Sequence, residues 1–472
     1  MTTFKPWRVF LQRCCIALPG LLVSLDLLIA AEPTWKAGTA ATVITPQKPM
    51  WMAGYGNRDH PAEGKLQDLW LKVLVLDDGV GHRAVVVTTD TLGIPRSMYE
   101  HSLAALREKF GLEPSQVMLS ASHTHCGPVL RQSLYDAYPI DANQIALIEE
   151  YSAELERDIV DTVGQALANL APARLRAGQG TASFAVNRRN NLEPDVAGLR
   201  EQHALKGPVD HDVPVLLVES TDGQLKAVVF GYACHNTTLN FYQWCGDYAG
   251  FAQLALERSH PGALAMFYMG CGADQNPIPR REVYLAERYG NLLAAAVEEV
   301  LLQAPACLEP RLATAMEMVD LNLDATPTEE ELEAKAKGPP TYATRWASRL
   351  LGELKAGKPL TRTYPYPVQV WKLGERQLWI KLGGEVVVDY ALRFKQEFGA
   401  HTWVTAYCND LMAYIPSHRV LREDIPPRES SRWGYEGNTS MMIYGLPAER
   451  WSDDIEERIG SSVRRLVAKV NG

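Results

Sequence analysis

The sequence lacks the motifs of several common functional classes. Its net charge is −9 over 472 residues and it has no basic block, so nucleic acid is not expected as a partner. It has no Cys-x-x-Cys pair, which argues against a thiolate zinc site, and no Gly-x-x-x-x-Gly-Lys-Ser/Thr loop for a nucleotide phosphate. Beyond the N-terminus no apolar run is long enough to span a membrane.

The first 31 residues differ from the rest. Lys5, Arg8 and Arg13 precede an apolar stretch over 14–31, and this order predicts a secretory signal peptide over 1–31. The alternative is a membrane anchor, against which Asp26 and the short span argue. We therefore expect an exported protein, periplasmic or secreted. The chain has eight cysteines, Cys14 and Cys15 lie in the signal peptide, and the spacing of the others defines no pairing.

Strand-like and helix-like segments alternate along residues 32–472. Alternating runs such as 69–76 predict strands, and the helical spacing of apolar residues over 141–170 predicts a long helix. This alternation predicts an α/β fold of layered mixed sheets with surrounding helices. We expect one catalytic domain over 32–472, in which the charged, Ala-rich stretch 326–360 forms a surface insertion with two helices.

Two histidines sit one residue apart after a short apolar run. His123 and His125 follow the predicted strand 117–119 and precede Gly127-Pro128. A strand that ends in His-x-His delivers two imidazoles to one side, which suits a metal site, or a metal site with a proton carrier beside it. The alternative is a pair of ordinary loop histidines. The local sequence does not distinguish the roles of the two residues.

Further polar residues follow predicted strands, and ligand sites in α/β proteins gather at strand ends. We expect them to share one site; they are Asp90, His123, His125, His235, Asp274, Glu385 and Asn409. Two histidines and a glutamate are a usual set for a catalytic zinc. Glu385 has the alternative role of a carboxylate at a helix N-terminus. The Gly-rich turn 270–277 is expected to bind an oxyanion or to be a plain turn.

Six segments, in the same order, resemble the neutral (non-lysosomal) ceramidases. Ser122-His123-Thr124-His125-Cys126-Gly127-Pro128 is similar to that family's Ser-His-Thr-His-Ser-Gly-Pro. The other five are Val186-Asn187-Arg188, Ala233 to Thr238, Gly383-Gly384-Glu385, Asn409 to Ile415 and Tyr435-Glu436-Gly437. The resemblance covers the family's catalytic region, and its C-terminal immunoglobulin-like domain is not expected here.

The resemblance implies a site with one zinc ion per chain. His123, His235, Glu385 and Tyr414 would bind the metal. His125, Arg188, Tyr435 and Asn276 would form the catalytic surroundings. Asn276 departs from the family, which has a catalytic serine at this position of its Asp-x-Ser-Pro segment. Asparagine is not a nucleophile, so a mechanism with zinc-activated water is compatible with this chain and an acyl-serine intermediate is not.

Together these features predict an exported zinc amidohydrolase that cleaves an N-acyl bond in a ceramide-like lipid or another small amide. A lipid substrate would also bring a peripheral membrane contact. One alternative is a two-metal hydrolase that uses His123 and His125 with Asp90 or Asp274, although the His-x-His-x-Asp-His pattern is absent. The other alternative is a binding protein that keeps the fold without catalysis, for which Asn276 is the main support.

Overall fold

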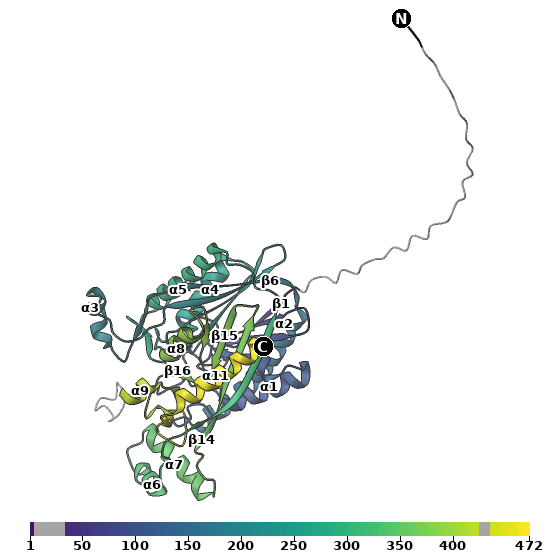
Figure 1. Cartoon of the computed structure of the whole chain (residues 1–472). Coiled ribbons are helices and arrows are strands. Elements are labelled where there is room, and N and C mark those ends of the chain that lie inside the picture. Colours follow the sequence, from purple (N-terminus) through teal and green to yellow (C-terminus); the bar gives the residue numbers. More distant parts are fainter. Residues whose placement is uncertain (4–33, 424–434) are drawn as a thin grey trace. The chain divides into compact units, whose positions relative to one another are not determined.

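Two mixed β-sheets stack on one another (Figure 1). The computed structural model describes residues 1–3, 34–423 and 435–472. The larger sheet has the order β11-β9-β8-β6-β1-β3-β4-β5, and the smaller has the order β13-β14-β15-β17. The strands of the larger sheet are β1 Lys36–Val43, β3 Trp70–Asp77, β4 Arg83–Thr89, β5 Val117–Ala121, β6 Ala171–Thr181, β8 Asp212–Ser220, β9 Leu225–Tyr232 and β11 Leu264–Met269. Those of the smaller are β13 Leu312–Asn322, β14 Thr363–Leu373, β15 Gln377–Leu382 and β17 Trp403–Thr405.

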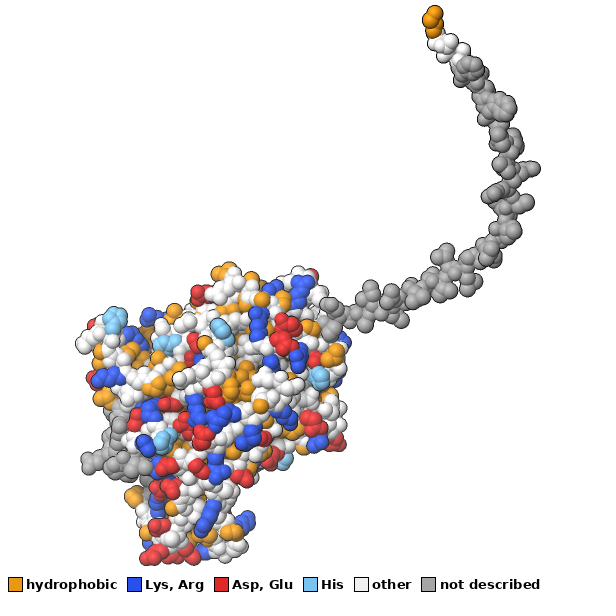
Figure 2. Space-filling view, viewed as in Figure 1, with side chains coloured by type: hydrophobic (Ala, Val, Ile, Leu, Met, Phe, Trp, Pro, Cys, Tyr) orange, Lys and Arg blue, Asp and Glu red, His pale blue; other side chains and the backbone are white. Residues whose placement is uncertain are grey.

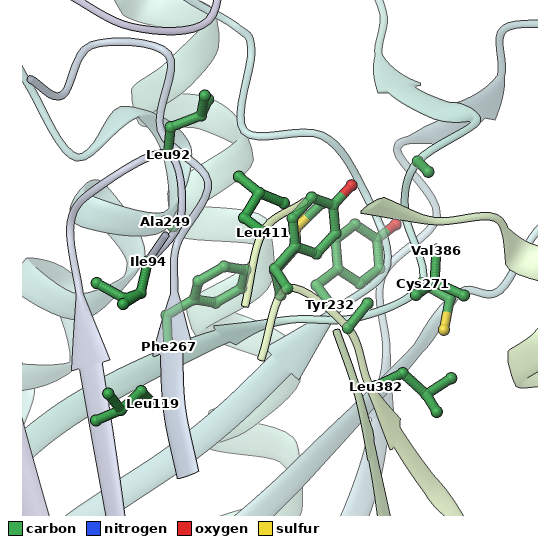
Figure 3. Packing of buried hydrophobic residues seen from close by; sticks show 14 of the residues in the cluster. Leu92, Ile94, Leu119, Tyr232, Ala249, Phe267, Cys271, Leu382, Val386 and Leu411 are labelled. Atoms are coloured by element: carbon green, nitrogen blue, oxygen red, sulfur yellow. The ribbon is translucent and has the colours of Figure 1, made fainter. Parts of the chain in front are cut away.

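Alternating side chains on the strands supply two cores. On β4, Val86 points toward the smaller sheet, into a cluster that includes Trp371, Trp379 and Trp403. The neighbouring Val85 and Val87 point the other way and pack with helices. This period of two is what a sheet covered on both faces requires. Figure 3 shows part of the core between the larger sheet and its helices, where Leu119, Phe267 and Tyr232 come from three different strands.

Helices cover the outer face of each sheet. The larger sheet is covered by α1 Arg96–Phe110, α2 Ala142–Ala168, α4 Asp247–Ser259 and α5 Val283–Gln303. The smaller sheet is covered by α8 Val388–Phe398 and α11 Ile455–Asn471, and α11 runs across β13 and β14 (Figure 1). The resulting order of layers is helix, sheet, sheet, helix. The predicted α/β class with layered mixed sheets is therefore confirmed.

Short elements carry the loops that hold the candidate site residues. Three two-strand pairs join segments far apart in sequence: β2 Gly64–Lys65 with β10 Gln243–Trp244, β7 Ala185–Asn187 with β12 Gln275–Pro277, and β16 Glu385–Val386 with β18 Tyr414–Ile415. The short helices are α3 Val196–Glu201, α9 His418–Glu423 and α10 Ser440–Ile443.

Two helices, α6 Glu329–Ala336 and α7 Tyr342–Lys355, form where two were expected in 326–360. They share a small core of their own around Leu332, Trp346 and Leu350. α7 also contacts α10, and Tyr342 at its start lines the main cavity. The assignment of this segment as an insertion, and of 32–472 as one catalytic domain, stays a prediction.

The proposed signal peptide lies outside the described residues apart from residues 1–3. Among the helices that the structure describes, none is long and apolar enough to cross a membrane. Acidic and basic side chains are interspersed over the face of the molecule seen in Figure 2.

Candidate metal and catalytic site

A cavity of about 1190 Å³ brings the sequence-predicted residues together. Seven of the eight line it: His125, Arg188, His235, Asn276, Glu385, Tyr414 and Tyr435. The eighth, His123, is buried behind this surface, with its Nε2 atom 3.3 Å from an oxygen of Glu385. Segments spread over more than 300 positions of the chain therefore converge on one place.

Backbone carbonyls fix the orientation of His123 and His235. The Nδ1 of His123 lies 2.7 Å from the carbonyl oxygen of Leu92, and the Nδ1 of His235 lies 2.8 Å from that of Gly272. A carbonyl oxygen only accepts, so Nδ1 carries the hydrogen in each ring. In the neutral ring the Nε2 lone pair then faces the cavity. This is the arrangement in which proteins present histidine to a metal.

Glu385 adds a third acceptor at the same point. Its strand β16 pairs with β18, and the register sets Glu385 opposite Tyr414. Its Oε2 atom lies 3.3 Å from Nε2 of His123 and 3.2 Å from Nε2 of His235, is buried, and receives no hydrogen bond. Its other oxygen, Oε1, accepts a hydrogen bond from Tyr444. The Nε2 atoms of His123 and His235 and the Oε2 atom of Glu385 are thus three acceptors that face one point.

The titration behaviour of these groups fits this picture. Burial, followed by the charge of Arg188, lowers the pKa of His235 to about 3, so this ring is neutral. Burial raises the pKa of Glu385, whereas positive charge or a donated hydrogen on the side of His123 and His235 holds it well below its usual range, so an ionised Glu385 requires positive charge at this point. A buried carboxylate beside a neutral imidazole lone pair is costly unless a cation neutralises it. The donor set of nitrogen and oxygen atoms suits zinc.

His125 is held differently from the other two histidines. Its Nε2 lies 3.3 Å from Nε2 of His123, whereas its buried Nδ1 has no hydrogen-bond partner. Contacts fix its ring: Tyr55 packs edge-on at 4.7 Å between centroids, and a side chain at Gly54 would come within 2.4 Å of the ring. Arg58 donates to its backbone oxygen at 2.7 Å. Neither ring nitrogen of His125 is therefore hydrogen-bonded to a backbone carbonyl.

The three histidines form the one cluster of metal-ligating type found in the described parts of the chain. Their ligand atoms lie within 4.8 Å of one another. Burial, followed by the other two histidines, lowers the pKa of His125 well below its usual range. The geometry therefore makes two ligand sets conceivable, one with His125 and one without it.

Arg188 organises the other side of the cavity. Its guanidinium donates to the Tyr414 hydroxyl at 3.3 Å, to Oδ1 of Asn276 at 3.3 Å and to Glu436 at 3.1 Å. It also lies 5.0 Å from the centre of the Tyr435 ring. Burial opposes its charge, but the neighbouring tyrosines and Glu436 raise the pKa of Arg188 well above its usual value. The Tyr414 hydroxyl is also 3.3 Å from Nε2 of His235, so Arg188 and the histidine site are connected.

Three of the predicted strand-end residues do not line this cavity. Asp90 accepts from the backbone N–H of Trp70, Asp274 from that of Val388, and Asn409 from that of Leu119. Each of these buried side chains has a structural partner, so the prediction of one shared site was wrong for them. Asp90 and Asp274 were the carboxylate ligands of the two-metal alternative. Because neither lines the cavity, they do not support that alternative.

The Gly-rich turn 270–277 does not offer the expected oxyanion cradle. The N–H groups of Gly272, Ala273 and Gln275 already donate to backbone carbonyls. The carbonyl of Gly272 instead holds His235. The turn therefore supports the histidine, and of its residues only Asn276 lines the cavity.

Several contributors could not be identified from the sequence. Tyr444 binds Glu385, Glu436 binds Arg188, and Leu92 and Gly272 contribute only their carbonyls. Every residue has a backbone carbonyl, so the sequence does not show which carbonyl will accept from a histidine. Glu436 belongs to the segment Tyr435-Glu436-Gly437 that carried the resemblance, which was the one available indication of it.

Comparisons with known proteins agree with the resemblance. Residues 35–269 match the model of the neutral/alkaline non-lysosomal ceramidases, N-terminal. The neutral ceramidase of Pseudomonas aeruginosa is 27% identical over 237 residues, which cover 47% of this chain and 34% of that protein. Neutral ceramidase A of Dictyostelium discoideum is 26% identical over 244 residues, 50% of this chain and 34% of that protein. The aligned part thus spans about a third of the length of these relatives.

Solved structures show the same fold over nearly the whole chain. The crystal structure of neutral ceramidase from Pseudomonas aeruginosa matches with a TM-score of 0.69 at 19% identity, covering 93% of this chain and 75% of that chain. A ceramidase complexed with C2 matches with a TM-score of 0.67 at 18% identity. The family match includes His123, His125, Arg188 and His235, whereas Glu385 and the residues after it lie beyond it.

Proposed function

We propose that the protein is a zinc-dependent amide hydrolase, because residues 35–269 match the model of the neutral/alkaline non-lysosomal ceramidases. The substrate would be an N-acyl amide, either a ceramide-like lipid or a smaller molecule. The observation that carries the proposal is the convergence of His123 Nε2, His235 Nε2 and Glu385 Oε2 without a donor among them.

In this proposal His123, His235, Glu385 and Tyr414 hold one zinc ion. The orphaned Oε2 of Glu385 and the carbonyl-fixed histidines support the assignment. A zinc ion bound there supplies a Lewis acid and lowers the pKa of a bound water to about 7. Hydrolysis breaks the C–N bond, adds the water oxygen to the acyl carbon and delivers a proton to the amine nitrogen.

His125 is the residue proposed to move that proton. Its Nε2 lies next to the metal-type site and its Nδ1 has no hydrogen-bond partner, so the ring can accept a proton at one nitrogen and release one without breaking a structural bond. Tyr55 and Gly54 hold the ring in place through packing. The contrast with His123 and His235, whose Nδ1 atoms are committed to carbonyls, supports separate roles.

Arg188, Tyr435 and Asn276 are proposed to hold the substrate. Arg188 has five N–H donors, and those not used by Tyr414, Asn276 and Glu436 can bind the acyl oxygen. Because Oδ1 of Asn276 accepts from Arg188, the amide N–H groups of Asn276 are the part available to a substrate. No nucleophilic side chain is needed in this scheme, which is compatible with asparagine at position 276.

A second ligand set has its own support. The ligand atoms of His123, His125 and His235 lie within 4.8 Å of one another, as a three-histidine zinc site requires. Replacing Tyr414 by Phe separates the two sets. If the first set binds the metal, Tyr414→Phe should lower the affinity for zinc. If the three histidines bind the metal, Tyr414→Phe should leave that affinity unchanged and His125→Gln should abolish it.

Export is also proposed, on the order of positive and apolar residues over 1–31. N-terminal sequencing of protein recovered outside the cytoplasm tests it. A mature N-terminus near residue 32 supports export by a cleaved signal peptide. An intact Met1 on active protein contradicts it.

A panel of N-acyl amides tests the proposed activity directly. The zinc-loaded protein is incubated with ceramide and with simple N-acyl amines, and release of fatty acid is measured. We expect hydrolysis, with His125→Gln retaining zinc but losing about 10²- to 10⁴-fold in kcat. Zinc binding without hydrolysis of any amide would favour the non-catalytic binding protein instead.

A further inference from the structure

Arg281 stands at the mouth of the cavity with an incompletely neutralised charge. Its side chain is 40% exposed, and its guanidinium lies 4.0 Å from Glu193. The guanidinium of the neighbouring Arg280 lies much closer to the same carboxylate, at 2.6 Å. Glu193 is therefore the partner of Arg280, and Arg281 is left available to a ligand.

The backbone at Arg281 is held in an unusual conformation. Its φ of +94° lies in a region that residues other than glycine rarely adopt. The N–H of Arg281 donates to the carbonyl of Thr238 at 2.6 Å, which holds the chain there. Such a conformation costs free energy, persists where surrounding structure enforces it, and is concentrated at functional sites.

The cavity lining has apolar and polar members that come from different segments. Leu134, Ala137, Tyr138 and Ile443 are apolar members, and α7 joins their segments because Arg345 donates to the carbonyl of Asp136 and Arg349 to that of Gly445. The polar members include Tyr55, Arg188, Glu193, Thr237, Arg280 and Arg281. An acyl chain suits the apolar members and a polar amine portion suits the polar ones.

The cavity lining has more positive than negative side chains. Among its fully charged side chains there are three arginines and two glutamates, Glu193 and Glu385. The buried Arg58 donates to the carbonyls of His125 and Phe241. A partly closed site with this balance attracts anions, especially if a metal neutralises Glu385.

We infer that Arg281 binds an anionic group on the amine portion of the substrate. The substrate class would then be N-acyl amides with a carboxylate close to the nitrogen, as in N-acyl amino acids. This inference rests on the proposed amide hydrolysis. Arginine is suited to it because its fork of donors matches a carboxylate.

Arg281 and His125 contact the same side chain of the lining, Tyr55. The centre of the Tyr55 ring lies 5.9 Å from the Arg281 guanidinium and 4.7 Å from the centre of the His125 ring. The Tyr55 hydroxyl donates to the carbonyl of Leu239 at 2.8 Å, which fixes this ring. Arg281 and His125 thus belong to the same part of the lining, which recognition of a carboxylate close to the amide nitrogen requires.

Two substrates of equal chain length test the inference. N-lauroylglycine carries the carboxylate, and N-lauroylethanolamine carries a neutral hydroxyl in its place. We expect the wild type to prefer the glycine conjugate in kcat/KM and Arg281→Gln to reduce that preference about tenfold, mainly through KM. Arg281→Lys should retain part of it. Arg311→Gln is the matched control, because Arg311 pairs with Glu375 outside the cavity lining.

Arg281→Gly separates ligand binding from a structural role. Glycine tolerates φ of +94°, so this variant should melt at a higher temperature than the wild type and still lose the preference for the carboxylate. If it is less stable than the wild type and keeps the preference, Arg281 has a structural role and the inference is wrong.

A binding measurement makes the result independent of turnover. Ketone analogues of the two substrates, with a methylene in place of the amide nitrogen, are titrated by calorimetry into the wild type and Arg281→Gln. We expect the anionic analogue alone to bind more weakly to the variant. The inference is wrong if the wild type hydrolyses the glycine and ethanolamine conjugates equally well and binds their two ketone analogues equally tightly. The proposed amide hydrolysis would not be affected by that result. If neither amide is hydrolysed, the proposed function fails and calorimetry still decides on Arg281.

Discussion

Two groups of buried polar side chains follow strands in this protein, and they differ in their partners. Asp90, Asp274 and Asn409 each accept a hydrogen bond from a backbone N–H of another segment. His123, His235 and Glu385 instead bring acceptor atoms together at one point, where Oε2 of Glu385 receives no hydrogen bond. The first group holds segments together. The second has the unmet demand for positive charge that we attribute to a metal ion.

This difference shows that position after a strand does not define a site. The sequence pattern is the same in both groups, and only the surroundings separate them. A buried polar group with a backbone partner contributes to folding, whereas convergent acceptors cost stability until a ligand arrives. Substitutions in the two groups should therefore have opposite effects on activity and stability.

The largest effect is expected for Glu385→Gln. The amide removes the negative charge that balances a cation, so zinc binding should be lost and hydrolysis should fall by about 10³-fold or more. The stability of the metal-free protein should change by less than about 1 kcal/mol, because Oε2 has no hydrogen bond to lose. Activity assays and denaturant melts of metal-free protein measure both quantities. A large loss of metal-free stability would place Glu385 in the structural group.

Gly54→Ala should have the next largest effect on activity. A Cβ atom at this position would come within 2.4 Å of the His125 ring, and φ of +102° strains any side chain there. We expect a displaced His125, about 10²-fold slower hydrolysis and unchanged zinc content. Gly56→Ala is the matched control, since nothing lies within 4 Å of a Cβ atom there. Equal rates for the two variants would show that the position of His125 is not critical.

Asp274→Ala should act on stability. The variant leaves the buried N–H of Val388 and the amide of Asn187 without their acceptor, at a cost of about 2 kcal/mol. Zinc content should stay at the wild-type level. Denaturant unfolding and metal analysis of the same sample check this prediction. Loss of zinc from a protein of unchanged stability would instead move Asp274 to the metal site.

Lys381 extends the comparison, because its amine is buried without an acidic partner among the described residues. Its Nζ atom lies 3.7 Å from the centre of the Trp371 ring and donates to the carbonyl of Trp379. Burial lowers the pKa of Lys381 well below its ordinary 10.5. The unfolded chain therefore binds this proton more tightly, so the contribution of Lys381 to stability rises with pH up to about 10.5.

Lys381→Met should stabilise the protein by about 1 kcal/mol or more near pH 7. The gain should shrink toward about pH 10, where the lysine of the unfolded chain also loses its proton. Melting temperatures of the two proteins across this range measure the difference. A gain that does not depend on pH would mean that Lys381 is protonated in the folded protein as well.

Most of the fold could be predicted because periodicity is a local signal. The helix α2 and the strand β3 lie close to the ranges 141–170 and 69–76 that the periodicity predicts. The sequence pattern does not predict the strands β6, β13 and β14. β14 contains Pro365 and Pro367, β13 is rich in Ala and Met, and β6 has two glycines and one β-branched residue. Pairing and burial outweigh these weak intrinsic preferences.

The sequence alone predicts only some of the site residues. The His-x-His pair is visible in the local sequence, but the difference between its members lies in the Leu92 carbonyl, which binds one and not the other. Arg188, Tyr414 and Tyr435 were identified through the family resemblance alone, because nothing local marks them. Tyr444 was missed for the same reason, since its contact with Glu385 joins residues that only the tertiary fold brings together.

Zinc stoichiometry in matched variants tests the central claim most directly. Wild-type protein, Glu385→Gln, His235→Ala and Asp274→Ala are purified without chelators, and metal per chain is measured by mass spectrometry. We predict about one zinc per chain in the wild type and Asp274→Ala, and none in Glu385→Gln and His235→Ala. A folded wild type that takes up no zinc, or Glu385 and His235 variants that keep it, would contradict the account.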